Sequence, residues 1–174
     1  KYIFMKILKY KNFALDFDGI FTNNKVYCDA NGNEIVRCCK YDSLALSILR
    51  KYIKNNKLNL NFFILSSEKN NVVTSRANKL EINVYQGIEN KFEFLENFLF
   101  EKQKTNVFNE LVYLGNDIND LDCIKECSFS ACPKDSPSII KENSDFVGKK
   151  NGGDGFIREV IEYLISPLNL NDMY

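Results

Sequence analysis

Short apolar runs alternate along this chain with longer stretches in which apolar residues recur every three or four positions. Runs of four or five apolar residues are typical of buried strands, and the wider spacing is typical of helices with one buried face. The runs predict strands at 13–17, 61–65, 82–85, 111–114 and 129–132. The spaced stretches predict helices at 43–49, 72–80, 91–99, 121–127, 138–142 and 156–165. Strands that alternate with helices favour an α/β protein, here a Rossmann-like three-layer fold with a central parallel sheet.

One segment breaks this alternation and predicts a β-hairpin. Residues 25–29 and 34–38 are β-prone and flank Ala30-Asn31-Gly32-Asn33, in which Asn-Gly is a strong turn signal. The hairpin follows the first strand and is too small to be a separate lid. We therefore expect a hairpin flap, with no separate cap domain.

The chain of 174 residues fits one folded domain. We expect a lead-in at 1–12, a folded domain at 13–166 and a polar tail at 167–174 after Pro167 stops the last helix. The first residue is Lys rather than Met, which fits a trimmed chain or a piece of a longer one.

Composition narrows the function classes. Lys plus Arg and Asp plus Glu number 23 each, so no basic field points to nucleic acid. The apolar runs are too short for a bilayer, so we expect no membrane partner. We interpret the cysteines as reduced thiols, which predicts a cytoplasmic location. No histidine occurs, which excludes His-based acid–base catalysis. The six cysteines lack the spacing of a zinc site.

Asp16 and Asp18 are the first candidates for chemistry. They follow the first predicted strand two residues apart, so both side chains can point to the same face. Open α/β sheets place ligands at the carboxyl ends of their strands. Two close carboxylates repel each other, and either a divalent cation or protonation relieves that repulsion. A solvated turn, in which Asp and Gly are common, is the alternative interpretation of this pair alone.

Three further polar signals follow later strands in the order expected for one site. Ser66 follows 61–65, Lys91 opens a helix after Gly87, and the turn 116–120 follows 111–114. Carboxylates for a cation, a hydroxyl and an ammonium suit phosphoryl transfer, which depends chiefly on positioning and charge stabilisation. Mg²⁺ prefers such oxygen ligands. Taken singly, Lys91 would be a solvated helix-start lysine and Ser66 an ordinary loop residue.

These motifs together resemble the haloacid dehalogenase-type phosphatases. The resemblance extends over 13–165 to the capless branch that contains 3-deoxy-manno-octulosonate 8-phosphate phosphatase. It is closest to the related domain of acylneuraminate cytidylyltransferases. The phrases that carry it are Asp16-Phe-Asp-Gly-Ile-Phe-Thr-Asn23, Lys40-Tyr-Asp-Ser-Leu44, Leu65-Ser-Ser-Glu-Lys-Asn70, Ser75-Arg-Ala77, Tyr85-Gln-Gly87 with Lys91, Gly115-Asn-Asp-x-x-Asp120 and Gly152-Gly-Asp-Gly-Phe-Ile-Arg-Glu159.

The resemblance implies roles for the candidate residues. Asp16 would be the nucleophile that forms an aspartyl-phosphate, and Asp18 the general acid and base. Ser66 and Lys91 would hold phosphate oxygens. The metal ligands would be Asp16, Asp18 and Asn116, which would hold Mg²⁺. The substrate would be contacted by Asp42 and Arg76. The site would be supported by Gly19, Asp117 and Asp120.

Asn116 departs from the family pattern, because most members of the family have Asp at this position. An amide oxygen can ligate Mg²⁺ but brings no charge, which leaves two hypotheses open. The first is a Mg²⁺-dependent phosphomonoesterase for a phosphorylated keto-deoxy sugar acid, of the nonulosonate 9-phosphate or octulosonate 8-phosphate class. The second is a catalytically attenuated domain that serves assembly or regulation of a cytidylyltransferase. By analogy, the hairpins of four copies would pack together in a homotetramer.

Overall fold

The computed structural model describes residues 6–103 and 107–165. The predicted tail at 167–174 and the first five residues of the predicted lead-in lie outside these residues. Among the described residues, no helix has both the length and the apolar composition needed to cross a membrane. The six cysteines are all free, and only Cys123 and Cys132 are fully buried.

A six-stranded sheet forms the middle layer, and every neighbouring pair of its strands is parallel. This confirms the predicted Rossmann-like α/β fold. The short edge strand at 146–147 was not predicted, because two residues carry no periodic signal. Across the sheet the strands are β5 (Asn83–Tyr85), β4 (Asn61–Leu65), β1 (Asn12–Leu15), β6 (Leu111–Leu114), β7 (Phe129–Cys132) and β8 (Phe146–Val147).

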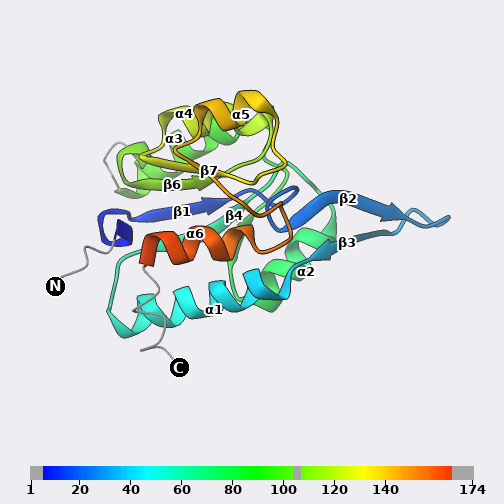
Figure 1. Ribbon diagram of the computed structural model, residues 1–174, viewed down its shortest axis with the longest axis horizontal. Coiled ribbons are helices and arrows are strands. Elements are labelled where there is room, and N and C mark those ends of the chain that lie inside the picture. The colour runs from blue at the N-terminus through cyan, green and yellow to red at the C-terminus, as the bar shows by residue number, and fades with distance from the viewer. Residues whose placement is uncertain (1–5, 104–106, 166–174) are drawn as a thin grey trace.

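Helices cover both faces of the sheet (Figure 1). On one face lie α1 (Lys40–Asn55), α2 (Asn71–Leu80) and α6 (Phe156–Ile165). On the other lie α3 (Lys91–Gln103), α4 (Leu121–Glu126) and α5 (Ser138–Asn143). Within the part of the chain that the structure describes, three short 3₁₀ helices lie between or before these elements: η1 (Lys6–Lys9), η2 (Val107–Glu110) and η3 (Ile118–Asp120).

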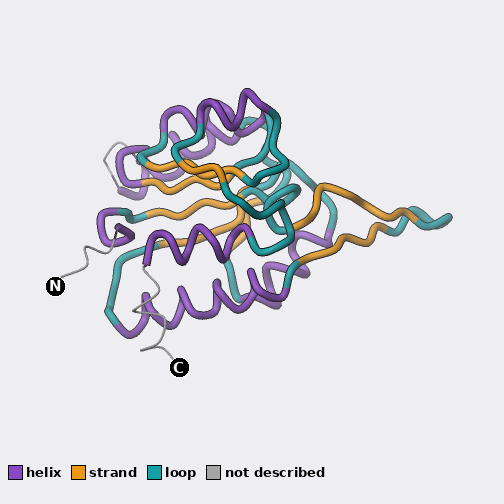
Figure 2. The backbone as a smooth tube through the Cα atoms, viewed as in Figure 1, coloured by secondary structure: helices purple, strands orange, loops and turns teal. Residues whose placement is uncertain are grey.

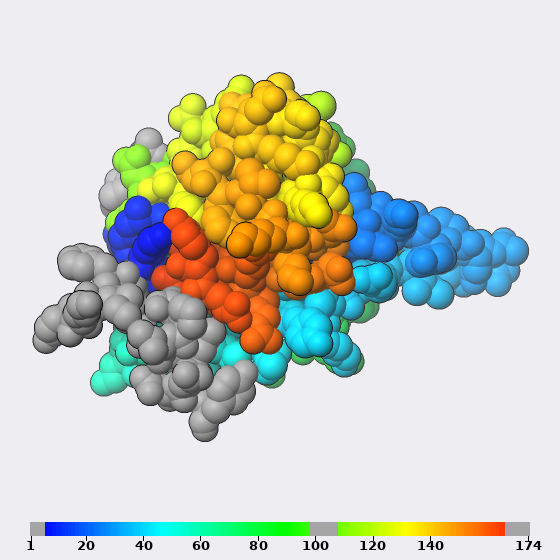
Figure 3. All heavy atoms as spheres, in the orientation of Figure 1, coloured from blue at the N-terminus to red at the C-terminus, as the bar shows by residue number. Residues whose placement is uncertain are grey.

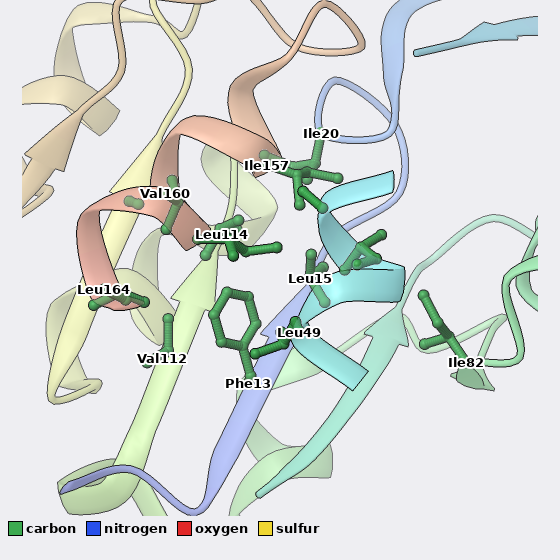
Figure 4. Close-up of a cluster of buried hydrophobic side chains, with 14 of the residues drawn as sticks. Phe13, Leu15, Ile20, Leu49, Ile82, Val112, Leu114, Ile157, Val160 and Leu164 are labelled. Atoms are coloured by element: carbon green, nitrogen blue, oxygen red, sulfur yellow. The ribbon is translucent and has the colours of Figure 1, made fainter. Parts of the chain in front are cut away.

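The strands are buried on both sides, so alternate residues enter two different cores. Phe13 and Leu15 of β1 face the α1–α6 side, whereas Ala14 between them faces the α3–α5 side. Figure 4 shows Phe13 and Leu15 packed beneath Val160 and Leu114 in the first core. This two-sided burial explains why the strands are near-continuous apolar runs rather than alternating patterns.

The predicted hairpin is present and is the only element inserted between β1 and α1 within the described residues. Its strands, β2 (Thr22–Cys28) and β3 (Glu34–Cys38), pair antiparallel. Figure 2 shows the hairpin extending from the body of the molecule as a two-stranded arm, and Figure 3 shows the same projection in the space-filling view. Its tip region leaves Tyr27 63% and Ile35 65% exposed, which is unusual for large apolar side chains.

The helix predicted at 43–49 begins earlier and ends later than expected, and Asp42, which precedes the predicted range, does not cap it. The helix begins at Lys40, and Asp42 lies inside its first turn. The Asp42 carboxylate instead accepts hydrogen bonds from the backbone N–H groups of Gly155 (3.1 Å) and Arg158 (2.9 Å) at the start of α6. Asp42 therefore caps the start of α6, which lies more than 100 positions further along the chain. Local sequence spacing does not reveal this contact.

Candidate active site

Most of the predicted site residues meet at the point where the order of successive strands across the sheet changes direction. After β1 the chain continues through α1 to β4 on one side, and it later returns to place β6 on the other side of β1. The loops that leave β1 and β6 therefore diverge, which opens a crevice at the carboxyl ends of these two strands. Asp16 follows β1, and Asn116 follows β6 by two residues.

A buried ion cluster lies in this crevice. The Nζ atom of Lys91 is 2.7 Å from Asp16 Oδ1 and 2.7 Å from Asp120 Oδ1. Lys91 is 1% exposed, Asp16 4% and Asp120 0%. The three residues come from three separate segments, so the sheet order brings together an ammonium and two carboxylates that are far apart in the sequence.

Asp120 is held by donors from its own turn and from β6. Its Oδ1 also accepts a hydrogen bond from the Tyr113 hydroxyl at 2.6 Å. Its Oδ2 accepts from the backbone N–H groups of Asn116 (2.9 Å) and Asp117 (3.4 Å). Asp117 accepts from the N–H of Ile118 at 2.8 Å and so caps the 3₁₀ helix η3. Asp120 thus fixes both the Lys91 ammonium and the turn that carries Asn116.

Lys91 is held in place by the loop that precedes α3. The N–H of Ile88 donates to the carbonyl of Ser66 (3.0 Å), and the N–H of Gly87 donates to that of Glu68 (2.9 Å). Asn90 accepts from the N–H of Glu93 at 3.1 Å, which is the geometry of a helix cap. The loop after β4 and the start of α3 are therefore one hydrogen-bonded unit.

Asp18 lies on a tight loop that is organised by Thr22. The Thr22 hydroxyl donates to Asp18 Oδ1 (3.3 Å) and accepts from the N–H groups of Gly19 and Asn24, both at 3.2 Å. Thr22 is fully buried at the base of the hairpin. The Thr22 hydroxyl therefore connects the Asp18 carboxylate to backbone N–H groups both before and after Thr22.

A second loop supports the Asp18 loop from behind. The N–H of Gly153 donates to the carbonyl of Ile20 at 3.0 Å. A Cβ atom added to Gly152 would lie 1.8 Å from the carbonyl oxygen of Gly19. The double glycine at 152–153 is thus required for close backbone approach between two loops of this chain.

Asn116 completes a set of three polar atoms that could hold a cation. One terminal atom of its amide lies 2.8 Å from the Asp18 carbonyl oxygen and 3.1 Å from Asp16 Oδ2. Adjacent ligands of an octahedral Mg²⁺ ion, with bonds of about 2.1 Å, are separated by about 3 Å. With the amide oxygen in this position, its distances to the other two oxygens fit adjacent ligands of Mg²⁺. Among the described residues no group of three His, Cys, Asp or Glu side chains gathers for a metal, so this mixed set is the candidate.

The charge of the cluster also favours a cation. Burial raises the pKa of Asp16 to about 8, the Asp120 carboxylate adds to the rise, and Lys91 offsets part of it. Burial lowers the pKa of Lys91, but Asp16 and Asp120 outweigh that effect and the net shift is upward. One ammonium is shared by two buried carboxylates, so the crevice lacks positive charge that a divalent cation can supply.

A small pocket of about 150 Å³ opens beside Asp18, between the hairpin and the loop after β4. Burial raises the pKa of Asp18, and the charges of Glu68 and Glu34 add to the rise. Both glutamates line the pocket, and Glu34 accepts a hydrogen bond from the Asn70 amide at 2.7 Å. The raised pKa makes Asp18 easier to protonate than an exposed aspartate, which suits a general acid.

Ser66 directly follows β4, which lies next to β1, and its buried hydroxyl accepts from the N–H of Glu68 at 3.1 Å. The structure does not bring Asp42 into the crevice, because its carboxylate is occupied at the start of α6. Arg76 lies on α2 and donates to the Ser43 hydroxyl. It lines a groove of about 730 Å³ between the hairpin and α2, together with Lys40 and Lys79.

Sequence reasoning did not assign a role to Tyr113, Thr22 or Gly152. Thr22 had a local signal, since it stands at a fixed distance from Asp18 in the Asp-x-Asp-Gly-x-x-Thr phrase. Tyr113 had none, because it reads as one more apolar residue of a buried strand. Gly152 stands in one of the phrases that carry the resemblance, but its contact with Gly19 depends on the tertiary structure.

No protein-family model matches the chain. Among solved structures, a HAD family hydrolase from Streptomyces avermitilis MA-4680 is 34% identical, and the match covers 93% of this chain and 88% of that one with a TM-score of 0.82. A 3-deoxy-D-manno-octulosonate 8-phosphate phosphatase from Moraxella catarrhalis, crystallised with magnesium, phosphate and KDO, is 26% identical. That match covers 97% of this chain and 91% of the other, with a TM-score of 0.82.

A curated relative of a second kind is N-acylneuraminate cytidylyltransferase A of Danio rerio, which is 22% identical over 147 residues. The match covers 84% of this chain but only 33% of that protein. The chain thus spans about a third of the length of this relative. The two kinds of relative confirm the resemblance that the sequence motifs indicated.

Proposed function

Because this chain belongs to the HAD family of hydrolases, we propose that it is a Mg²⁺-dependent phosphomonoesterase that works through an aspartyl-phosphate on Asp16. The observation that carries the proposal is the 2.7 Å contact between the buried Lys91 ammonium and the Asp16 carboxylate at the carboxyl end of β1. A phosphoryl group bound there would meet a carboxylate nucleophile and a fixed positive charge together.

The chemistry divides into two displacements at phosphorus. In the first, an Asp16 carboxylate oxygen bonds to phosphorus and the ester P–O bond breaks, while Asp18 gives its proton to the leaving alcohol oxygen. In the second, the Asp18 carboxylate takes a proton from water as the water oxygen bonds to phosphorus. The Asp16–phosphorus bond then breaks, which releases inorganic phosphate and restores both carboxyl groups.

The remaining residues bind and orient. Lys91 would contact phosphoryl oxygens from its position between Asp16 and Asp120, and Ser66 would add a hydroxyl donor from the end of β4. Asp16, the Asp18 carbonyl and the Asn116 amide oxygen would hold Mg²⁺. When bound, Mg²⁺ would neutralise charge on the phosphoryl group and on Asp16. Asp117, Asp120 and Gly19 would keep the turn around Asn116 in place.

For the substrate we propose a phosphorylated keto-deoxy sugar acid. The Moraxella relative is named for an octulosonate 8-phosphate, and its crystal contains KDO. In this chain the pocket beside Asp18 shares Glu34 and Asn70 with the groove that contains Arg76, Lys40 and Lys79. Glu and Asn near the ester suit sugar hydroxyls, and the basic end of the groove suits a carboxylate. A direct contact of Asp42 with the substrate stays a prediction.

The test is phosphate release from a panel of sugar acid phosphates, with Mg²⁺ and with a chelator. We expect Asp16→Asn to fold like the wild type and to lose activity by at least about a thousandfold, since the amide is not a nucleophile. The exposed Asp122 of α4 offers a matched control, and Asp122→Asn should retain activity. Wild-type turnover by Asp16→Asn would show that Asp16 is not the nucleophile.

A second candidate function is a catalytically attenuated domain that assembles with a cytidylyltransferase. Two observations favour it: Asn116 replaces the usual Asp, and the chain matches a third of a cytidylyltransferase. This candidate predicts tetramer formation without hydrolysis of any sugar phosphate in Mg²⁺. Hydrolysis that appears only in Asn116→Asp would place the attenuation at the metal ligand. A homotetramer and a cytoplasmic location remain part of the proposal, as does 13–166 as the phosphatase domain.

A further inference from the structure

The two terminal atoms of the Asn116 amide have different surroundings. One lies between two acceptors, the Asp18 carbonyl oxygen at 2.8 Å and Asp16 Oδ2 at 3.1 Å. The other lies against Gly19, where an added Cβ would be 2.0 Å from it. In protein without a cation, the amide nitrogen belongs in the first position, because it can donate one hydrogen to each acceptor.

Aspartate at position 116 would not be able to do this. A carboxylate has only acceptor atoms, so it would face the Asp18 carbonyl and the Asp16 carboxylate without a hydrogen to share. Asn116 is 7% exposed and Asp16 is 4% exposed, so water would screen the repulsion poorly. The neutral amide removes both the charge repulsion and the unpaired acceptors.

The same side chain fits the cation-bound state after a half turn about its Cβ–Cγ bond. The turn exchanges nitrogen for oxygen, and the amide oxygen then lies 2.8 Å from the Asp18 carbonyl oxygen and 3.1 Å from Asp16 Oδ2, separations that suit adjacent ligands of Mg²⁺. The exchange needs little space, because the nitrogen and oxygen of an amide are nearly the same size. Gly19 leaves room for whichever atom turns toward it.

We propose that Asn116 is a two-position amide that stands in for the cation in metal-free protein and turns to ligate Mg²⁺ when the ion binds. This inference rests on the metal site of the proposed function. It implies that Asn116 makes the metal-free site more stable than aspartate would, and the affinity for Mg²⁺ lower. The affinity is lower because hydrogen bonds from Asn116 must break before the ion enters.

The first test compares the wild type with Asn116→Asp by thermal unfolding in a chelator and in Mg²⁺, together with calorimetric titration of Mg²⁺. In the chelator we expect the melting temperature of Asn116→Asp to fall by about 5 °C. Its affinity for Mg²⁺ should rise on the order of tenfold, because the ligand gains a charge. Asn119→Asp is the matched control: Asn119 is exposed in the same turn, and the same change there should alter neither quantity.

A second measurement uses the wild type alone, so it does not depend on the folding of a variant. In ¹⁵N-labelled protein the side-chain NH₂ protons of Asn116, assigned through its backbone, should be protected from exchange in the chelator. Addition of Mg²⁺ should remove that protection and shift this pair more than the pair of Asn119. An Asn116→Asp protein that folds only in Mg²⁺ would be the strongest form of the expected result.

Each contrary outcome has a separate meaning. Mg²⁺ binding with equal metal-free stability of the wild type and Asn116→Asp, or an unmoved Asn116 NH₂ pair, would overturn the two-position amide and leave the proposed function intact. Failure of both proteins to bind Mg²⁺ would overturn the proposed metal site and this inference with it. Loss of phosphatase activity alone would bear on the proposed function only, since neither readout here is activity.

Discussion

At the scale of single residues, Asp120 decides how the cluster in the crevice is arranged. Its two oxygens accept from the Lys91 ammonium, the Tyr113 hydroxyl and the N–H groups of Asn116 and Asp117. Burial of charged groups is costly, so such a cluster contributes more to geometry than to stability. The cost is offset because every donor aimed at Asp120 meets an oxygen, and Lys91 is held toward Asp16 as a result.

Tyr113→Phe tests this arrangement. The change removes one hydrogen bond to a charged, fully buried acceptor, so the free energy of unfolding should fall by about 1.5–3 kcal/mol. Denaturant unfolding measures this loss. Tyr163 is 42% exposed, and Tyr163→Phe should change stability by less than about 0.5 kcal/mol. Equal effects of the two changes would mean that the Tyr113 hydroxyl does not support Asp120.

At the scale of elements, the loop between β8 and α6 connects parts that are distant in the sequence. Its Gly152 and Gly153 contact the loop after Asp18, and Gly155 begins the segment that Asp42 of α1 anchors. The loop thus contacts both the segment that carries Asp18 and the start of α6, and so helps to position both. We expect two consequences that local structure alone would not produce.

Gly152→Ala should lower both stability and activity. Its Cβ would lie 1.8 Å from the Gly19 carbonyl oxygen, so the backbone next to Asp18 must move. We expect a stability loss of about 2 kcal/mol or more and a fall in kcat/KM of at least about tenfold. Gly32→Ala at the hairpin tip is the contrast. No atom lies within 4 Å of an added Cβ there, and the alanine would be strained only by the positive φ of 80°. That variant should lose stability but keep its kcat/KM.

The pKa of Asp42 predicts a pH dependence of stability. Burial raises this pKa above its ordinary value, although the N–H groups of Arg158 and Gly155 lower it. The folded state then holds a proton at pH values where the unfolded chain has lost it. This contribution to stability is fully present below the unfolded pKa and is lost as the pH rises through the folded one.

Asp42→Asn removes the titrating group and leaves the shape. We expect the unfolding free energy of the wild type minus that of the variant to fall as the pH rises from about 4, near the ordinary carboxyl pKa, toward 7. Denaturant unfolding across this range measures the difference. A difference that grows with pH would mean that the pKa is lowered. A large rise in KM with unchanged stability would instead favour the substrate role that the sequence suggested for Asp42.

At the scale of the whole molecule, the hairpin is the feature that a single chain does not explain. It extends from the body and leaves Val26, Tyr27 and Ile35 each at least 51% exposed (Figure 3). Water contact with large apolar side chains is unfavourable, and such patches are typical of association surfaces. This supports the proposed packing of hairpins between copies. Such packing would also shield the crevice from solvent.

Replacement of Tyr27 and Ile35 by Ser should dissociate the assembly while the fold survives, because neither side chain belongs to the core. Light scattering coupled to size exclusion measures the mass at micromolar concentration. We expect a tetramer for the wild type and a monomer for the double variant. Leu8 is 54% exposed outside the hairpin, and Leu8→Ser should stay tetrameric. A monomeric wild type would end the proposal.

The sequence alone was sufficient for the layer architecture, since apolar periodicity is a local property. Most strand and helix positions were predicted, because buried strands such as 61–65 and 111–114 are short and continuous. The misses share one cause. The edge strand 146–147 exists only because β7 offers it a partner, and Asp42 caps a helix that the sequence places 113 residues away.

The identity of the candidate site residues was likewise determined by the sequence, because Asp16, Asp18, Ser66, Lys91 and Asn116 each follow a recognisable strand or open a helix. The tertiary structure alone decided how they meet. Strand β6 lies beside β1 although two strands of the sheet and the hairpin separate them in sequence, and only that order brings Lys91 between Asp16 and Asp120. Charge clusters, loop contacts and amide orientation depend on such non-local neighbours, which a linear pattern does not contain.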